Sequence, residues 1–184
     1  MPLGKRGPYE VVSSREVYRG ARISLRCDHV IQPGGSERDF DILEMVEGST
    51  VLALSDDHTA YLTREYKYAV GRECLELISG AIDEGETALE AAQREIKEEA
   101  GLTASEWIPL GVLDPFTSTV RSPNHMFLAL GAVLGEPDPD EGEVIHTVAV
   151  PFSQAVEMVL RGDITHGASC VAILKAERLL RERR

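Results

Sequence analysis

Apolar and polar residues follow one another along this chain mainly in short runs that favour β-strands, with three longer segments that have helical spacing. A pair of strands is expected within residues 16–31. Residues 32–36, which contain Pro-Gly-Gly, predict a turn. Further strands are expected at residues 39–45, 49–54, 60–64, 74–78, 107–113, 126–134 and 144–150, and helices at residues 88–100, 153–161 and 168–183. This order of elements indicates an α/β/α sandwich with a mixed sheet.

The helix expected at residues 88–100 carries a start signal, a stop signal and an apolar stripe. Thr87 and Glu90 have the spacing of a capping box, in which each side chain accepts a backbone hydrogen bond from the other residue. Gly101 suits the left-handed conformation that ends many helices. With about 100° between successive residues, the buried stripe is expected to consist of Leu89, Ala92, Ile96 and Ala100.

Three carboxylates share a neighbouring face of the same helix. Glu95 and Glu99 lie one turn apart, with Glu98 beside them, and like charges at this spacing destabilise a helix by roughly a few tenths of a kcal/mol. A positive group is therefore expected among them. Mg²⁺ or Mn²⁺ fits best, because these cations prefer carboxylate and carbonyl oxygens and residues 80–102 contain no Cys or His. The alternative is a solvated helix face on which Arg94 pairs with Glu98.

Residues 80–102, GAIDEGETALEAAQREIKEEAGL, resemble the Nudix box. That pattern is Gly, five residues, Glu, seven residues, then Arg-Glu-apolar-x-Glu-Glu-x-Gly-apolar, and every specified position matches. The resemblance implies the Nudix fold and a metal-dependent hydrolase acting on a nucleoside diphosphate linked to another group. It supports Glu95, Glu98 and Glu99 as metal ligands, and it places Arg94 and Glu98 among the candidate catalytic residues.

The sequence before this box is similar to the ADP-ribose pyrophosphatase branch of the Nudix family. Residues 62–68, LTREYKY, are similar to its basic and aromatic strand, and residues 75–80, LELISG, to its Leu-Glu-Leu-Pro-Ala-Gly segment. Lys67 stands where an arginine is usual, so it would grip a pyrophosphate as a point charge. The backbone carbonyl of Ser79 is a further candidate metal ligand. The expected substrate-binding residues are Arg64, Lys67, Arg72, Glu76 and Gly80; alternatively, the three cations are the solvated edge of a strand.

A general base is expected either in an acidic loop beyond the box or within the box itself. Residues 137–143, PDPDEGE, lie where the resembled branch carries a Glu-x-Glu loop. The resemblance therefore implies Glu141 as the base and Glu143 as an accessory ligand of metal or water. Glu98 is the alternative base, because it lies beside the other carboxylates on the helix.

Composition narrows the partners and the cellular location. The formal net charge of −12 argues against binding to a nucleic acid. No stretch approaches the roughly 18 apolar residues of a membrane span, and the first residues lack the apolar core of a secretory signal, so no membrane partner and a cytoplasmic location are expected. Residues 1–48 form a separable N-terminal β section before a Nudix catalytic domain at residues 49–184. This front section resembles the one exchanged between subunits in the same branch, which implies a homodimer.

The residues and the resemblance together predict a Mg²⁺- or Mn²⁺-dependent hydrolase of a small nucleotide sugar. ADP-ribose is the first expected substrate, with AMP and ribose 5-phosphate as the products. GDP-mannose or another nucleotide sugar is an alternative, because the sequence does not distinguish between bases. A second alternative is a Nudix-like sensor that binds a nucleotide sugar without hydrolysing it, although such sensors often have a damaged box and this one is intact.

Overall fold

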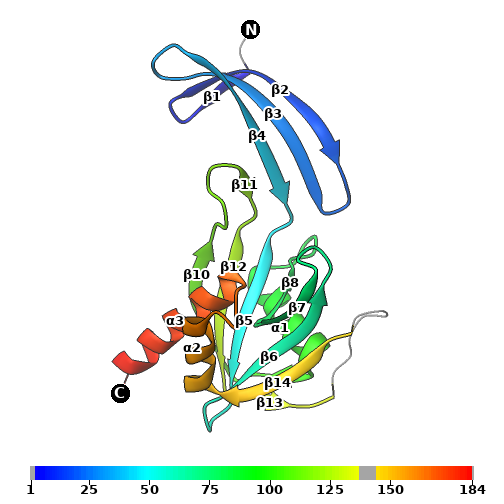
Figure 1. Ribbon diagram of the computed structural model, residues 1–184, viewed down its shortest axis with the longest axis vertical. Coiled ribbons are helices and arrows are strands. Elements are labelled where there is room, and N and C mark those ends of the chain that lie inside the picture. Colours follow the sequence, from blue (N-terminus) through cyan, green and yellow to red (C-terminus); the bar gives the residue numbers. More distant parts are fainter. Residues whose placement is uncertain (1–2, 137–143, 184) are drawn as a thin grey trace. The chain divides into compact units, whose positions relative to one another are not determined.

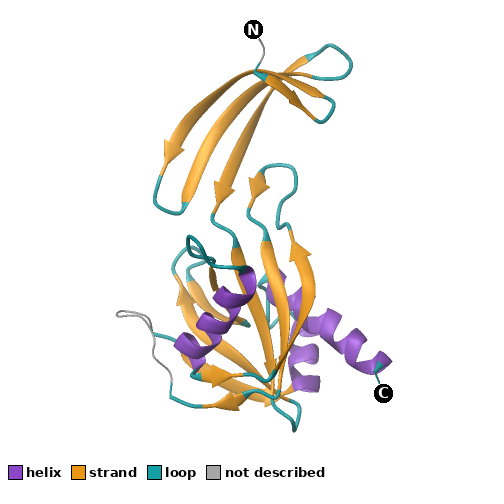
Figure 2. Cartoon of the chain, turned by 180° about the vertical axis from the view of Figure 1, so that it is seen from behind, coloured by secondary structure: helices purple, strands orange, loops and turns teal. Residues whose placement is uncertain are grey.

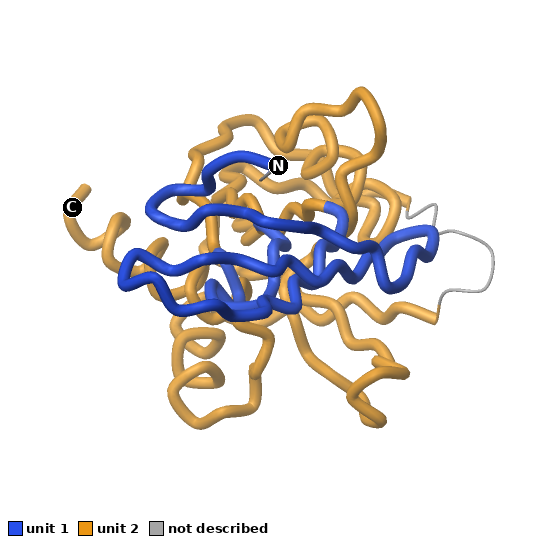
Figure 3. The backbone as a smooth tube through the Cα atoms, turned by 90° about the horizontal axis from the view of Figure 1, so that it is seen from above, with its two compact units in different colours: residues 1–46, 114–123 blue, residues 47–113, 124–184 orange. Residues whose placement is uncertain are grey.

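The computed structural model describes residues 3–136 and 144–183 and divides the chain into two compact units. Unit 1 comprises Met1–Val46 and Asp114–Pro123, and unit 2 comprises Glu47–Leu113 and Asn124–Arg184 (Figure 3). Each unit has its own sheet. The box segment lies entirely within unit 2.

Unit 1 is a five-stranded sheet in the order β1-β2-β3-β4-β11. The first four strands pair antiparallel, whereas β11 runs parallel to β4. β2 starts well before residue 16, because Tyr9 already packs edge-to-face against Phe40 of β4, with ring centroids 5.6 Å apart. The strands are β1 (Gly4–Arg6), β2 (Tyr9–Arg19), β3 (Ile23–Ile31), β4 (Glu37–Met45) and β11 (Val120–Arg121).

Unit 2 is built on a seven-stranded mixed sheet with the main order β10-β12-β5-β6-β14 (Figure 1). β12 and β5 pair parallel, and the other pairs are antiparallel. Its strands are β5 (Gly48–Leu54), β6 (Thr59–Lys67), β7 (Arg72–Glu76), β8 (Ile78–Ala81), β10 (Glu106–Leu113), β12 (Asn124–Leu130) and β14 (His146–Pro151), and a separate small pair is β9 (Leu102–Thr103) with β13 (Val133–Leu134). The helices are α1 (Ala88–Ala100), α2 (Phe152–Arg161) and α3 (Gly167–Glu182).

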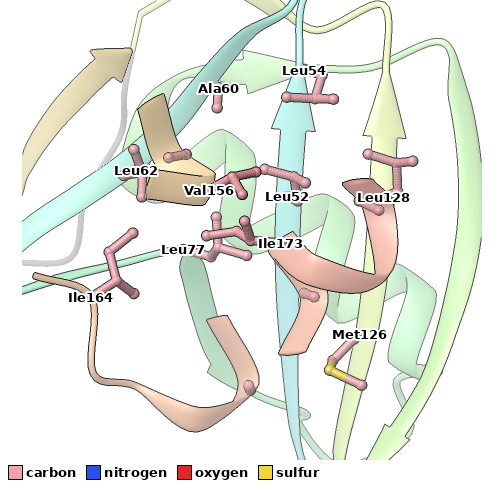
Figure 4. Packing of buried hydrophobic residues seen from close by; sticks show 14 of the residues in the cluster. Leu52, Leu54, Ala60, Leu62, Leu77, Met126, Leu128, Val156, Ile164 and Ile173 are labelled. Atoms are coloured by element: carbon pink, nitrogen blue, oxygen red, sulfur yellow. The ribbon is translucent and has the colours of Figure 1, made fainter. Parts of the chain in front are cut away.

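The sheet of unit 2 is apolar on both faces, because helices cover both (Figure 2). Successive residues of β5 alternate between two cores. Leu52 and Leu54 pack with α2 and α3, as Figure 4 shows for Val156 and Ile173. The intervening residues of β5 pack with α1 in the second core. The expected α/β/α sandwich with a mixed sheet is therefore confirmed. No helix in the described ranges is long and apolar enough to cross a membrane.

α1 has the predicted bounds and caps but a different buried stripe. The backbone N–H of Thr87 donates to Oε2 of Glu90 at 2.8 Å, and the N–H of Glu90 donates to Oγ1 of Thr87 at 3.2 Å. Gly101 ends the helix with φ 64°. The expected burial of Leu89 is wrong, because its side chain is 37% exposed. The stripe is instead displaced toward Glu95, which is only 8% exposed.

The strand expected at residues 74–78 is in fact two strands, separated at Leu77. β5 and β6 pair directly only where Ala53 and Leu54 oppose Tyr61 and Ala60. Beyond that point the two strands have different partners: β7 pairs with β6, and β8 pairs with β5. The chain therefore changes partner strands at Leu77, immediately before the box.

Candidate active site

The packing of Glu95 against Gly80 joins the helix of the box to its first residue. A Cβ atom at Gly80 would lie 1.9 Å from Oε1 of Glu95, so any side chain at this position would displace the carboxylate. Glycine here permits a close approach of the carboxylate, and its backbone angle is not unusual. The carboxylate of Glu95 therefore lies directly against the backbone of Gly80 in β8.

Arg94 lies at the centre of a cluster of carboxylates formed by Glu86, Glu95 and Glu98. Its Nε and Nη2 donate to the two carboxylate oxygens of Glu86 at 2.9 and 3.0 Å. Its Nη1 donates to Glu95 at 2.8 Å and to Glu98 at 2.9 Å, and its Nη2 also donates to the carbonyl of Ala81 at 2.9 Å. The hydrogen bond to Glu86 is the main cause of the raised pKa of Arg94, and Arg94 in turn lowers the pKa of Glu86.

Lys67 lies among carboxylates at the end of β6. Burial alone would lower its pKa, but the hydrogen bond to Glu65 and the charges of Glu65, Glu76 and Glu99 raise it above the ordinary value. Its Nζ is 4.0 Å from Oε2 of Glu76. Lys67 therefore remains protonated, and its interaction with Glu99 links it to the last turn of α1.

Arg64, another predicted substrate cation, is placed differently from Lys67. Along β6, Ala60 and Leu62 face the core formed with α2 and α3, while Tyr61 packs against the α1 core. The same alternation places Arg64 on the α2 and α3 face and Lys67 on the other face. Arg72 is the register partner of Lys67, and its Nη2 donates to Oγ1 of Thr165 at 2.8 Å.

The donor set of the cluster suits a hard divalent cation, since it consists of carboxylate oxygens close to the backbone of β8. Ser79 in β8 opposes Thr50 of β5, and its hydroxyl donates to the carbonyl of Leu77 at 3.1 Å. Among the described residues, no three His, Cys, Asp or Glu side chains are gathered closely enough to hold a metal as they stand. The predicted base Glu141 and accessory ligand Glu143 lie outside the described residues.

The structure adds side chains that the sequence did not single out. His166 and Ser169, at the start of α3, lie beside β7, with Nδ1 of His166 3.9 Å from Oε2 of Glu76. Both residues are distant from β7 in the sequence: Ser169 lies 92 positions after Leu77. No local motif marks them, and only the packing of α3 could have identified them.

Comparison with known proteins places this geometry in a family. A family model described as NUDIX domain matches residues 46–169. The chain is 31% identical to the ADP-ribose pyrophosphatase of Mycobacterium tuberculosis (strain ATCC 25618 / H37Rv), with 90% of this chain and 82% of that protein covered. It is 24% identical to the ADP-ribose pyrophosphatase of Bacillus subtilis (strain 168), with 89% and 90% covered.

A solved structure supports the same assignment at the level of the fold. The crystal structure of an ADP compounds hydrolase is similar to this chain with a TM-score of 0.83 at 22% identity, and 94% of each chain is covered. The resemblance of the sequence to the Nudix family, and to its ADP-ribose pyrophosphatase branch, is thus confirmed. The chain belongs to the NUDIX domain family and is a Nudix hydrolase.

Proposed function

We propose that this Nudix hydrolase cleaves the diphosphate linkage of a nucleoside diphosphate sugar, with ADP-ribose as the preferred substrate and AMP and ribose 5-phosphate as the products. The names of the two relatives support this substrate class. The observation that carries the proposal is the packing of Glu95 against Gly80, which brings the acidic turn of α1 against β8. Lys67 interacts with Glu99 of the same turn, so a cation for the substrate adjoins the carboxylates.

We infer that Mg²⁺ or Mn²⁺ is the cofactor. Glu95, Glu98 and Glu99 would hold it with the backbone carbonyl of Ser79, and Glu143 would be an accessory ligand. The oxygen-only donor set supports this choice over zinc. When bound, such a cation neutralises phosphate charge and lowers the pKa of water.

The protein groups are proposed to bind the substrate, hold the carboxylates and accept a proton. Lys67 offers a protonated ammonium to the pyrophosphate. Arg94 holds Glu95 and Glu98 through the hydrogen bonds described above. Glu141 or Glu98 accepts the proton of the attacking water. Arg72, Glu76 and Gly80 complete the proposed substrate site; Arg64, which the sequence also predicts there, lies on the opposite face of β6 from Lys67.

A product assay tests the proposed function. ADP-ribose with Mg²⁺ is expected to give AMP and ribose 5-phosphate, and a chelator should abolish the reaction. GDP-mannose and diadenosine polyphosphates, assayed in parallel, should be cleaved more slowly. Faster cleavage of GDP-mannose would reassign the substrate. Tight binding of ADP-ribose without any product after prolonged incubation would instead support the alternative that the protein is a sensor that binds a nucleotide sugar without hydrolysing it.

We infer that the protein is a homodimer that uses the sheet of unit 1. The elements of this unit within the described residues are strands alone. Among those residues, Val30 is the only buried hydrophobic one. One hollow of about 600 Å³ is lined by apolar side chains, among them Tyr9, Val11, Phe40 and Ile42, together with polar and charged residues. A single-layered sheet has no second layer to bury these apolar side chains. We propose that the sheet of a second copy of this chain covers them.

The mass of the protein in solution tests this inference. Light scattering coupled to gel filtration should give about twice the mass of one chain, because an isologous pairing of two sheets closes the assembly. A single-chain mass at micromolar concentration would contradict it. The cytoplasmic location expected from the sequence remains a prediction.

A further inference from the structure

The chain changes partner strands at Leu77, and the backbone N–H of Leu77 donates a hydrogen bond to a side chain there. β7 pairs with β6 as far as Glu76, and β8 pairs with β5 from Ile78 onward. The N–H of Leu77 donates to Oγ of Ser169 at 2.9 Å. Leu77 and Ser169 are both 0% exposed, so water does not reach this hydrogen bond. A buried N–H without an acceptor destabilises the folded protein. Ser169 therefore fixes the position of Leu77, where the chain changes partner strands.

Ser169 is held in turn by His166, the N-cap residue of α3. Nδ1 of His166 lies 2.8 Å from Oγ of Ser169. Burial lowers the pKa of His166; the charge of Glu76 opposes this effect, and the charge of Lys67 adds to it. The ring is therefore neutral at neutral pH. Since Oγ of Ser169 accepts from Leu77, its hydroxyl can donate to the unprotonated Nδ1, which continues the hydrogen-bond chain.

The turn before α3 also reaches the other end of β7. Oγ1 of Thr165 accepts a hydrogen bond from Nη2 of Arg72 at 2.8 Å. Nδ1 of His166 lies 3.9 Å from Oε2 of Glu76, and the same carboxylate oxygen lies 4.0 Å from Nζ of Lys67. The turn therefore contacts the first and last residues of β7, and through Glu76 it adjoins the proposed substrate cation.

We propose that His166 and Ser169 are positioning residues of the active site. They hold the backbone at Leu77, where the chain changes partner strands. In this way they position Lys67 and Glu76 before Leu77 in the chain and the backbone of β8 after it. The identity of the ligand that these groups bind rests on the proposed function, whereas the hydrogen-bond chain does not. Because Lys67 and Glu76 are assigned to binding, loss of this chain should raise KM more than it lowers kcat.

Amide hydrogen exchange tests the positioning without any substrate. In His166→Ala and in Ser169→Ala, exchange across residues 72–81 should become faster by about tenfold. His166→Asn, which keeps an acceptor oxygen close to the position of Nδ1, should remain within about twofold of the wild type. Ser153→Ala, which removes an exposed hydroxyl from the first turn of α2, is the matched control for Ser169→Ala. Unchanged exchange in both His166→Ala and Ser169→Ala would overturn the proposal.

Steady-state kinetics with ADP-ribose distinguishes a positioning role from a purely structural one, because only a positioning role predicts a change in KM with little change in kcat. His166→Ala should raise KM by about tenfold with kcat within about threefold of the wild type, and His166→Asn should restore KM. An equal rise in KM for the Ala and Asn variants would contradict the role of the acceptor. If the wild type hydrolyses no nucleotide sugar, the proposed function fails, and the hydrogen-exchange result still decides the positioning role.

Discussion

Gly80→Ala should lower kcat for ADP-ribose by about 10²-fold while the protein remains folded, because a misplacement of about 1 Å within an active site can cost this much. The added Cβ would lie 1.9 Å from Oε1 and 2.0 Å from Cδ of Glu95. The carboxylate ends a flexible side chain, so it can move without unfolding α1. Steady-state kinetics and a thermal melting curve measure the two effects separately.

Gly34→Ala is the matched control for the substitution at Gly80. A Cβ atom at Gly34 would meet nothing within 4 Å, and its φ lies outside the left-handed region. This variant should therefore have wild-type kcat. If Gly80→Ala also keeps the wild-type kcat, the position of Glu95 against β8 is not needed for turnover.

Glu141→Gln should lower kcat by about 10² to 10⁴-fold, the usual effect of removing a general base, with little change in metal affinity. Glu98 is the competing base. Its Oε2 accepts a hydrogen bond from Arg94 at 2.9 Å. This contact orients the carboxylate of Glu98 and occupies one of its two oxygens with a protein donor.

Three Gln variants decide between the two bases when kcat is measured at saturating Mg²⁺ and metal binding is measured separately. Glu143→Gln should lower kcat less than Glu141→Gln does, since Glu143 is assigned only an accessory role. A Glu141→Gln enzyme within a few-fold of the wild type, together with a much slower Glu98→Gln enzyme, would assign the base to the box instead.

Local signals in the sequence were sufficient to predict the helix of the box. Thr87, Glu90 and Gly101 interact with backbone within a few residues of themselves, so their spacing specifies both ends of α1. Leu89 was mispredicted because the facing strand decides which stripe is buried. Gly80 leaves room there for a carboxylate, and the helix turns Glu95 toward it.

The change of partner strand at Leu77 was not predictable from the local pattern. Residues 74–78 contain a largely apolar run that is compatible with one buried strand. Whether such a strand keeps its partner depends on the divergence of β5 from β6 and on Ser169, which is distant in sequence. For the same reason, the sequence grouped Arg64 with Lys67, although the register of β6 places them on opposite faces.

The two-segment composition of unit 1 determines how the chain can be shortened. Removing residues 1–46 alone would delete β4, and β11 would then lose the only strand with which it pairs among the described residues. Leu113 and Asn124, which flank the second segment, are register partners in β10 and β12. A two-residue Asn-Gly turn between them would therefore close an ordinary β-hairpin. Unit 2 can thus be encoded as one continuous polypeptide only if both excisions are made together.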